Sequence, residues 1–151
     1  MAAPAPAVVM RAPGNPAGAG TVPASSTNAA DFKYACSLSL PGKAGERVNS
    51  EVLINPHFDF IVRRITWDFA TQNNTVPKVR VTWRDTRRGY LDRKALITAV
   101  FGLPGEDFPF TAGLRLARGE TISFEADTLD DSTGAIDIVL HGVELRPQSE
   151  A

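Results

Sequence analysis

Cysteine is nearly absent from the sequence, because Cys36 is the single one among 151 residues. A lone cysteine cannot form an intrachain disulfide, which excludes the disulfide-stapled scaffolds of small secreted proteins. Long apolar runs are also missing, and none approaches the roughly 20 residues that a membrane-spanning helix needs. The short run Ala7–Met10 has no basic segment before it and is flanked by prolines, unlike a secretory signal. We therefore expect a soluble protein that is made in the cytoplasm.

Net charge is small as well, since 16 basic and 17 acidic side chains give a formal charge of −1. Without an overall basic field, the composition offers no argument for nucleic-acid binding. The two histidines, His57 and His141, have no other metal ligands at a typical spacing around them. No glycine-rich phosphate loop is present either. The sequence therefore favours a protein without metal, cofactor or enzymatic activity, in which both histidines are ordinary turn or strand residues.

Residues 1–30 differ in composition from the rest of the chain. They contain ten alanines, five prolines, three glycines and one charged side chain, Arg11. Proline removes hydrogen-bond donors and glycine adds backbone freedom, so neither helix nor sheet is favoured there. We expect an extended arm over residues 1–30, either disordered or lying along another protein, and one β-sandwich domain over residues 31–151.

After residue 30, apolar and polar side chains alternate in the way that half-buried strands require. Strand patterns cover residues 31–40, 47–55, 58–69, 76–85, 94–101, 112–117, 121–128 and 135–145. Turn residues separate these segments, and none has a convincing helical pattern. About eight strands at this spacing predict an all-β fold, an antiparallel β-sandwich similar to a jelly roll.

Two of these strand patterns carry further predictions. In residues 58–69, predicted to be a central strand, the apolar side chains change face near Val62–Arg64, which indicates either a β-bulge there or burial on both faces for part of the strand. We expect residues 76–85 to form a hairpin with this strand. Within residues 31–40, Cys36 lies on the apolar face, so it is predicted to be a small core residue and not a nucleophile.

Asp127, Asp130 and Asp131 form the densest acidic cluster and surround the end of the strand pattern 121–128. Oxygen-rich loops can hold Ca²⁺, but the spacing of an EF-hand is absent here. Aspartates in loops commonly cap turns instead, through hydrogen bonds to nearby backbone N–H groups. We expect these aspartates to cap turns, and Ca²⁺ binding by the loop is the alternative.

Charge is distributed unevenly along the second half of the chain. Seven basic and two acidic residues lie within Lys78–Lys94, whereas six acidic and no basic residues lie within Gly119–Asp137. Two interpretations fit equally well: complementary patches that join copies of the chain, or the ordinary polar faces of strands. Arg84, Arg87 and Arg88 are candidate partner-binding residues of the basic block. No nucleic-acid-binding motif accompanies them, so we expect no direct contact with nucleic acid.

A series of short segments between residues 47 and 142 carries a resemblance to a known class of proteins. The segments are EVLIN at 51–55, FDFIVRRI at 58–65, WRD at 83–85, RRGYL at 87–91, FG at 101–102, LARGETISF at 116–124 and IVLHG at 138–142. In this pattern the chain resembles small virion structural proteins of tailed bacteriophages. The resemblance implies a non-enzymatic particle component, such as a capsid decoration (cement) protein, that is located in the virion. It also implies binding to the major capsid protein and to other copies of the chain, without a small-molecule substrate or a membrane.

Proteins of this kind often clamp neighbouring subunits with an arm, and residues 1–30 suit that role. The arm residues expected to contact a partner are Pro4, Pro6, Val8, Val9, Met10, Arg11 and Val22. A neck, tail or head-completion protein is the alternative within the same particle. From another class, a carbohydrate-binding jelly-roll module is the alternative, because Tyr90, Phe108 and Phe110 lie in predicted loops and can stack on a sugar.

Overall fold

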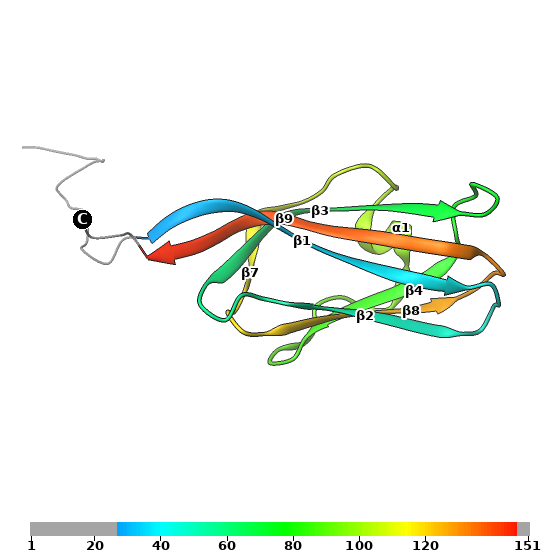
Figure 1. Cartoon of the computed structure of the whole chain (residues 1–151), viewed down its shortest axis with the longest axis horizontal. Helices are drawn as coiled ribbons and strands as arrows, with labels where there is room; N and C mark the ends of the chain where they lie inside the picture. Colours follow the sequence, from blue (N-terminus) through cyan, green and yellow to red (C-terminus); the bar gives the residue numbers. More distant parts are fainter. Residues whose placement is uncertain (1–26, 148–151) are drawn as a thin grey trace, which may run out of the picture. The chain divides into compact units, whose positions relative to one another are not determined.

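The computed structural model describes residues 27–147, and most of them lie in two antiparallel sheets that pack face to face (Figure 1). The first sheet has the strand order β1-β9-β3-β7. These strands are Thr27–Pro41 (β1), Thr133–Pro147 (β9), Asp59–Thr71 (β3) and Phe108–Leu116 (β7). Strands that are neighbours in this sheet are far apart in the sequence, so the sheet is held together by non-local contacts.

The second sheet has the strand order β2-β8-β4-β5, and β6 also pairs with β4. These strands are Arg47–Leu53 (β2), Thr121–Thr128 (β8), Val79–Asp85 (β4), Gly89–Tyr90 (β5) and Ala95–Leu96 (β6). A five-residue helix, Ile97–Phe101 (α1), follows β6. The predicted antiparallel β-sandwich is therefore confirmed. No helix among residues 27–147 is long and apolar enough to cross a membrane.

The hydrophobic core lies between the two sheets and follows the predicted alternation. On β8, Ile122, Phe124 and Ala126 are fully buried, while the side chains between them are partly exposed. The Phe124 ring stacks on Trp83 of β4, with 5.5 Å between ring centroids and 12° between ring planes. From the other sheet, Trp67 of β3 is buried as well and donates its indole N–H to a backbone carbonyl at 2.8 Å. Burying large side chains from both sheets is the main force that holds the sandwich together.

A β-bulge interrupts β3 where the sequence predicts it. Val62 pairs with Gly142 of β9, and the next paired residue, Arg64, lies opposite His141. Arg63 is therefore an extra residue without a partner position on β9. β3 lies between β9 and β7, so its predicted central position is also confirmed.

The hairpin predicted between residues 58–69 and 76–85 is wrong. β3 pairs with β9 and β7 in the first sheet, whereas β4 pairs with β8, β5 and β6 in the second. Both edges of β3 are already occupied by strands from distant parts of the chain. The connection after β3 therefore crosses from one sheet to the other instead of folding back as a tight turn.

The strand predicted over residues 94–101 is also wrong, as is the expectation that no helix forms. Strand pairing ends at Leu96, and α1 follows immediately. Ile97, Val100 and Phe101 are all buried. Their spacing of three and four residues places them on one face of a helical turn, which brings Phe101 against Trp83 with 5.8 Å between ring centroids.

Two element bounds differ from the predictions. The predicted loop over 103–110 and strand over 112–117 overlap one irregular edge strand, β7, whose pairing with β3 begins at Phe108 and is interrupted before Leu114. β1 begins at Thr27 and thus includes the last four residues of the segment 1–30. The remaining residues of that segment, 1–26, lie outside the described part of the chain.

Candidate functional site

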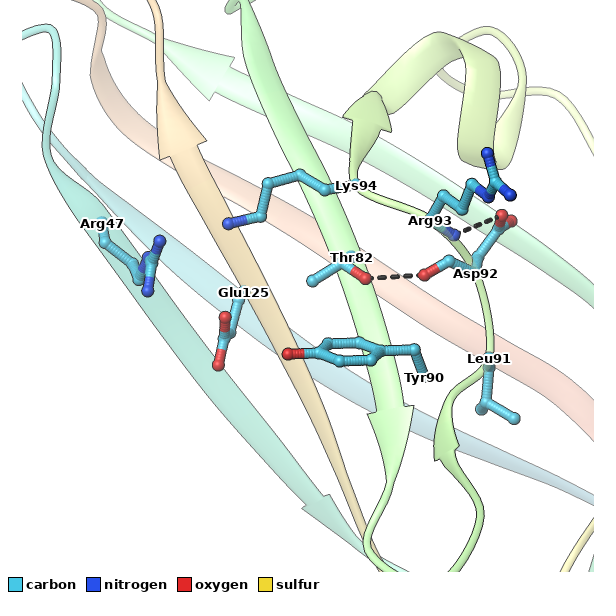
Figure 2. Close-up of a pocket in the computed structure, with 8 residues that line it drawn as sticks. All are labelled: Arg47, Thr82, Tyr90, Leu91, Asp92, Arg93, Lys94 and Glu125. Atoms are coloured by element: carbon cyan, nitrogen blue, oxygen red, sulfur yellow. Dashed lines mark hydrogen bonds between the residues drawn. The ribbon is translucent and has the colours of Figure 1, made fainter.

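The candidate functional site is an open groove of about 540 Å³ on the outer face of the second sheet (Figure 2). Its lining residues are Arg47, Thr82, Tyr90, Leu91, Asp92, Arg93, Lys94 and Glu125. Those on β4 and β8 alternate with buried core residues, so they face away from the interior. The groove is therefore a surface site formed by the sheet and by the segment that joins β5 to β6.

Residues 91–94 form one wall of this groove, and we call them the arch. β5 and β6 both pair with β4, and the arch projects over the sheet between these two attachments. The Thr82 hydroxyl donates to the Asp92 carbonyl at 2.7 Å, and the Leu91 N–H donates to the Trp83 carbonyl at 2.9 Å. Thr82 is only 3% exposed although it points outward, because the arch covers it. The alternation in β4 predicts the outward direction of this side chain but not its burial.

Tyr90 provides an aromatic surface in the groove. Its side chain is 67% exposed, and the Arg84 guanidinium lies 5.6 Å from the ring centroid. Figure 2 shows the ring lying across the groove, with its hydroxyl directed toward Glu125. An exposed ring beside hydrogen-bonding side chains suits stacking against the flat apolar face of a ligand such as a sugar.

An ion-pair triad joins three segments next to this groove. The Asp127 carboxylate accepts hydrogen bonds from Lys94 Nζ at 2.8 Å and from Arg47 Nε at 2.9 Å. The hydrogen bond from Lys94, followed by that from Arg47, holds the pKa of Asp127 below its usual value. Lys94 belongs to the arch, Arg47 to β2 and Asp127 to β8, so the triad fixes the arch relative to the sheet. Each of these ion pairs is partly exposed and contributes modestly to stability.

Of the three arginines predicted to bind a partner, all form contacts within the molecule. Arg84 lies on Tyr90, as described above. Arg87 forms an ion pair with the buried Glu120 carboxylate. Arg88 pairs with the buried Asp85 at 3.2 Å and also donates to a backbone carbonyl of β7 at 2.7 Å. These contacts hold the arginines at the end of β4, where the side chains of Arg87 and Arg88 remain exposed and that of Arg84 is half-buried.

Asp85 and Glu120 form a buried carboxylate cluster that sequence analysis did not single out. Asp85 accepts the Arg87 backbone N–H at 2.8 Å, and Glu120 accepts the Thr86 hydroxyl. Burial raises the pKa of Asp85, but hydrogen bonds from the Arg87 N–H, Glu120 and Arg88 outweigh it, so this pKa lies below its usual value. Asp85 continues the inward-facing positions Val79, Val81 and Trp83 of β4, so its burial follows the alternation, whereas Glu120 belongs to a turn whose burial the sequence does not indicate.

The basic and acidic blocks of the sequence lie side by side in the fold. β4 and β8 are paired, and Arg80 lies opposite Asp127 in their register. The ion pairs Arg87–Glu120 and Lys94–Asp127 also join one block to the other. The two blocks are therefore partly paired with each other inside one molecule, by two ion pairs.

The aspartates of the loop after β8 cap turns, as predicted. Asp130 accepts the backbone N–H groups of Lys78 at 3.0 Å and of Ser132 at 3.1 Å. Asp131 accepts the Ala44 N–H at 2.9 Å. Between residues 27 and 147, no three His, Cys, Asp or Glu side chains come together in a group that could hold a metal ion.

The structure separates the three aromatics predicted to stack on a sugar. Phe108 and Phe110 are half-buried and pack against each other with 5.7 Å between ring centroids. Phe110 also contacts Trp83 of the core. Tyr90 alone among the three lines the groove, so the two phenylalanines act as hydrophobic anchors of β7.

Other predicted positions lie away from the groove. Cys36 packs at the margin of the core, and burial raises the pKa of its thiol to about 11, in keeping with a core residue. His57 is an exposed turn residue, and His141 lies on β9. The arm residues Pro4, Pro6, Val8, Val9, Met10, Arg11 and Val22 lie outside the described residues.

The groove therefore combines an exposed aromatic ring with donors from Arg47, Arg93 and Lys94 and an acceptor carboxylate from Glu125. This chemistry suits a ligand that stacks on the ring and forms hydrogen bonds with the side chains around it. The sequence matches no protein-family model and no curated protein.

Proposed function

We propose that the protein is a non-enzymatic structural component of a bacteriophage particle, and more specifically a capsid decoration protein. Two features support the proposal: the sequence pattern across residues 47–142, and a sandwich body whose turns are fastened by internal ion pairs. The observation that carries it is the pairing of the basic block with the acidic block along β4 and β8, where two ion pairs join them. Because Arg87 and Lys94 are engaged within the body, we assign attachment to the segment that precedes it.

On this proposal, the part of the predicted arm that precedes β1, residues 1–26, binds along major capsid subunits or neighbouring copies of the chain. A fully extended chain of 26 residues spans up to about 90 Å, which is enough to cross more than one subunit. Their small apolar side chains and single charge suit contact with another protein's surface. Weak contacts repeated over a symmetric shell add up to firm attachment through avidity.

Deleting residues 1–26 tests this proposal without disturbing β1, which begins at Thr27. The deletion variant should retain its far-ultraviolet circular dichroism and thermal transition but lose co-sedimentation with particles that lack the protein. A full-length variant with residues 1–26 in scrambled order is the matched control for length and composition. Binding by the deletion variant at full strength would refute the role of the arm.

Cryo-electron microscopy of the reconstituted particle then distinguishes the alternatives within the same class. Density at many symmetry-equivalent sites on the shell is the result expected of a decoration protein. Density restricted to the neck or tail would retain a structural role and replace decoration by the neck or tail alternative. Failure of the full-length protein to bind any particle component would overturn the structural proposal itself.

A carbohydrate-binding function is the second candidate, and the exposed Tyr90 ring in the groove favours it. A glycan array with the full-length protein tests for a ligand. For any glycan that binds, Tyr90→Ala should weaken affinity at least about tenfold through lost stacking. Leu103→Ala, which changes an exposed apolar side chain outside the groove, should leave affinity unchanged. An array without hits would exclude this candidate.

A further inference from the structure

A second groove, of about 350 Å³, lies on the outer face of the first sheet and crosses β1, β3 and β9. Its lining residues are Asp31, Phe32, Lys33, Arg63, Arg64, His141, Gly142 and Val143. Three of these side chains are basic, one is a carboxylate, and His141 adds an imidazole. The groove therefore has an excess of positive charge and of hydrogen-bond donors.

The bulge in β3 produces this concentration of charge. In a regular strand, successive side chains point to opposite faces, so Arg63 and Arg64 would not share a groove. Arg63 is the extra residue of the bulge, between the pairs Val62–Gly142 and Arg64–His141. Both arginines consequently line the same groove. Bulges commonly re-aim side chains in this way next to functional sites.

The positive charges of this groove are only partly balanced by the protein. Arg64 Nη1 contacts Asp107 Oδ1 at 2.6 Å. Within residues 27–147, neither Lys33 nor Arg63 has a carboxylate at ion-pair distance. Like charges gathered in one groove repel one another, and a bound anion would relieve this repulsion.

His141 lies within the same electrostatic environment. Its Nε2 shares a hydrogen bond of 2.8 Å with the Thr66 hydroxyl, while its buried Nδ1 has no hydrogen-bond partner among the described residues. Burial, followed by the positive charges of Arg64 and Lys33, lowers the pKa of His141, and Asp107 acts in the opposite direction. An anion in the groove would offset the two positive charges, so the imidazole can report on binding.

We propose that this groove binds a phosphate group between Lys33, Arg63 and Arg64. Guanidinium groups offer paired N–H donors that match phosphate oxygens, and an ammonium adds a third point of charge. The volume is near the lower end of the roughly 300–1,000 Å³ of small-molecule sites, which suits a phosphate with a small attached group. Phe32 also lines the groove, but its ring packs on the core side of β1, 4.9 Å from the Tyr34 ring and 6.5 Å from the Phe60 ring between centroids, so the three cations provide the binding contacts. The inference is independent of the proposed particle function.

The test is an NMR titration of the full-length protein with inorganic phosphate and, separately, with phenyl phosphate. Ionic strength is held constant with sodium chloride. Binding should give saturable shifts of the amides at residues 31–33, 62–65 and 141–143, and it should raise the pKa of His141. Arg63→Gln should weaken binding about tenfold or more, because charge-assisted hydrogen bonds are lost. Arg80→Gln, which changes an exposed arginine outside both grooves, is the matched control and should bind as the unmodified protein does.

Tighter binding of phenyl phosphate would support a phosphate ester whose attached group also contacts the groove, and equal affinities would support binding of the phosphate group alone. Lys33→Gln provides a second variant on a different strand and should weaken binding in the same way. Shifts that do not saturate, or that Arg63→Gln and Lys33→Gln leave unchanged, would overturn the proposal. A saturable response to a glutamate-rich peptide without any response to phosphate would overturn it in favour of an acidic protein partner.

Discussion

Replacing Asp85 by asparagine should weaken the end of the sandwich where β4 turns into β5. Asp85 is 1% exposed and is the last residue of β4. Its oxygens accept the Arg87 N–H at 2.8 Å and the Arg88 guanidinium at 3.2 Å. Asparagine has nearly the same shape and retains one acceptor oxygen, so core packing should be unaffected. It removes the negative charge and places an NH₂ donor where a carboxylate oxygen stood.

The size of the expected loss of stability follows from these contacts. Asparagine can keep the hydrogen bond to the Arg87 N–H but not the charge-assisted one from Arg88, since two donors would then face each other. A hydrogen bond to a charged group contributes about 1.5–3 kcal/mol, and leaving a buried group unsatisfied costs a similar amount. The Arg88 side chain is 45% exposed and can return to water, which reduces the loss. We expect a decrease of about 2 kcal/mol in the free energy of unfolding.

The loss of stability caused by Asp85→Asn should depend on pH. The pKa of Asp85 is lowered in the folded protein, so its carboxylate contributes stability above its unfolded pKa of about 3.9. That contribution disappears as the pH falls through the lower folded pKa. The difference between Asp85→Asn and the unmodified protein should therefore be full near neutral pH and shrink below about pH 4.

Urea unfolding followed by the fluorescence of Trp67 and Trp83 measures this difference, since both indoles are buried in the core. Glu106→Gln is the control, because Glu106 is exposed and should change stability by less than about 0.5 kcal/mol. A loss below about 0.5 kcal/mol for Asp85→Asn, or a difference that is the same at all pH values, would refute the reasoning.

Three further predictions concern the backbone, the thiol and the arch. Gly134→Ala should lower the free energy of unfolding, measured by thermal unfolding, by at least about 3 kcal/mol, because the new Cβ would lie 2.0 Å from a carbonyl oxygen of β3. Gly105→Ala is the control: its Cβ would meet open space, so only the positive φ should matter, at about 1 kcal/mol. Cys36, with a pKa of about 11, should be alkylated roughly 100-fold more slowly near pH 8 in the folded than in the urea-unfolded protein. Thr82→Val should lower the urea-unfolding free energy by about 1 kcal/mol and speed amide exchange of the arch, since it loses the bond to the Asp92 carbonyl.

Alternation of apolar side chains was enough to locate most strands of this fold. The bounds of β8 match the prediction over residues 121–128, because every second side chain there enters the core. The bulge at Val62–Arg64 was predictable for the same reason, since an extra residue shifts the apolar positions to the other face. Alternation failed at residues 97–101, where three buried side chains at helical spacing were taken for a strand.

The pairing of the strands and the two grooves could not be predicted from the sequence. β3 and β4 follow each other in the chain yet pair with distant strands, and no local pattern records that choice. The first groove brings Arg47 of β2 next to the arch and Glu125 of β8. Thr82 looks like an exposed polar position, because its burial comes from the arch that covers it.

The place of β9 between β1 and β3 also has a consequence for biosynthesis. The second sheet can form once residue 128 has left the ribosome, but β1 has no neighbouring strand until residues 133–147 are made. At ~5–20 residues per second, those 15 residues take roughly 1–3 s to translate. During that time β1 lacks the strand that fixes it in the first sheet, so Leu38 and Leu40 are not yet held in the core where they are buried in the finished fold. A chain whose translation stops before β9 should therefore be a substrate for chaperones and proteases.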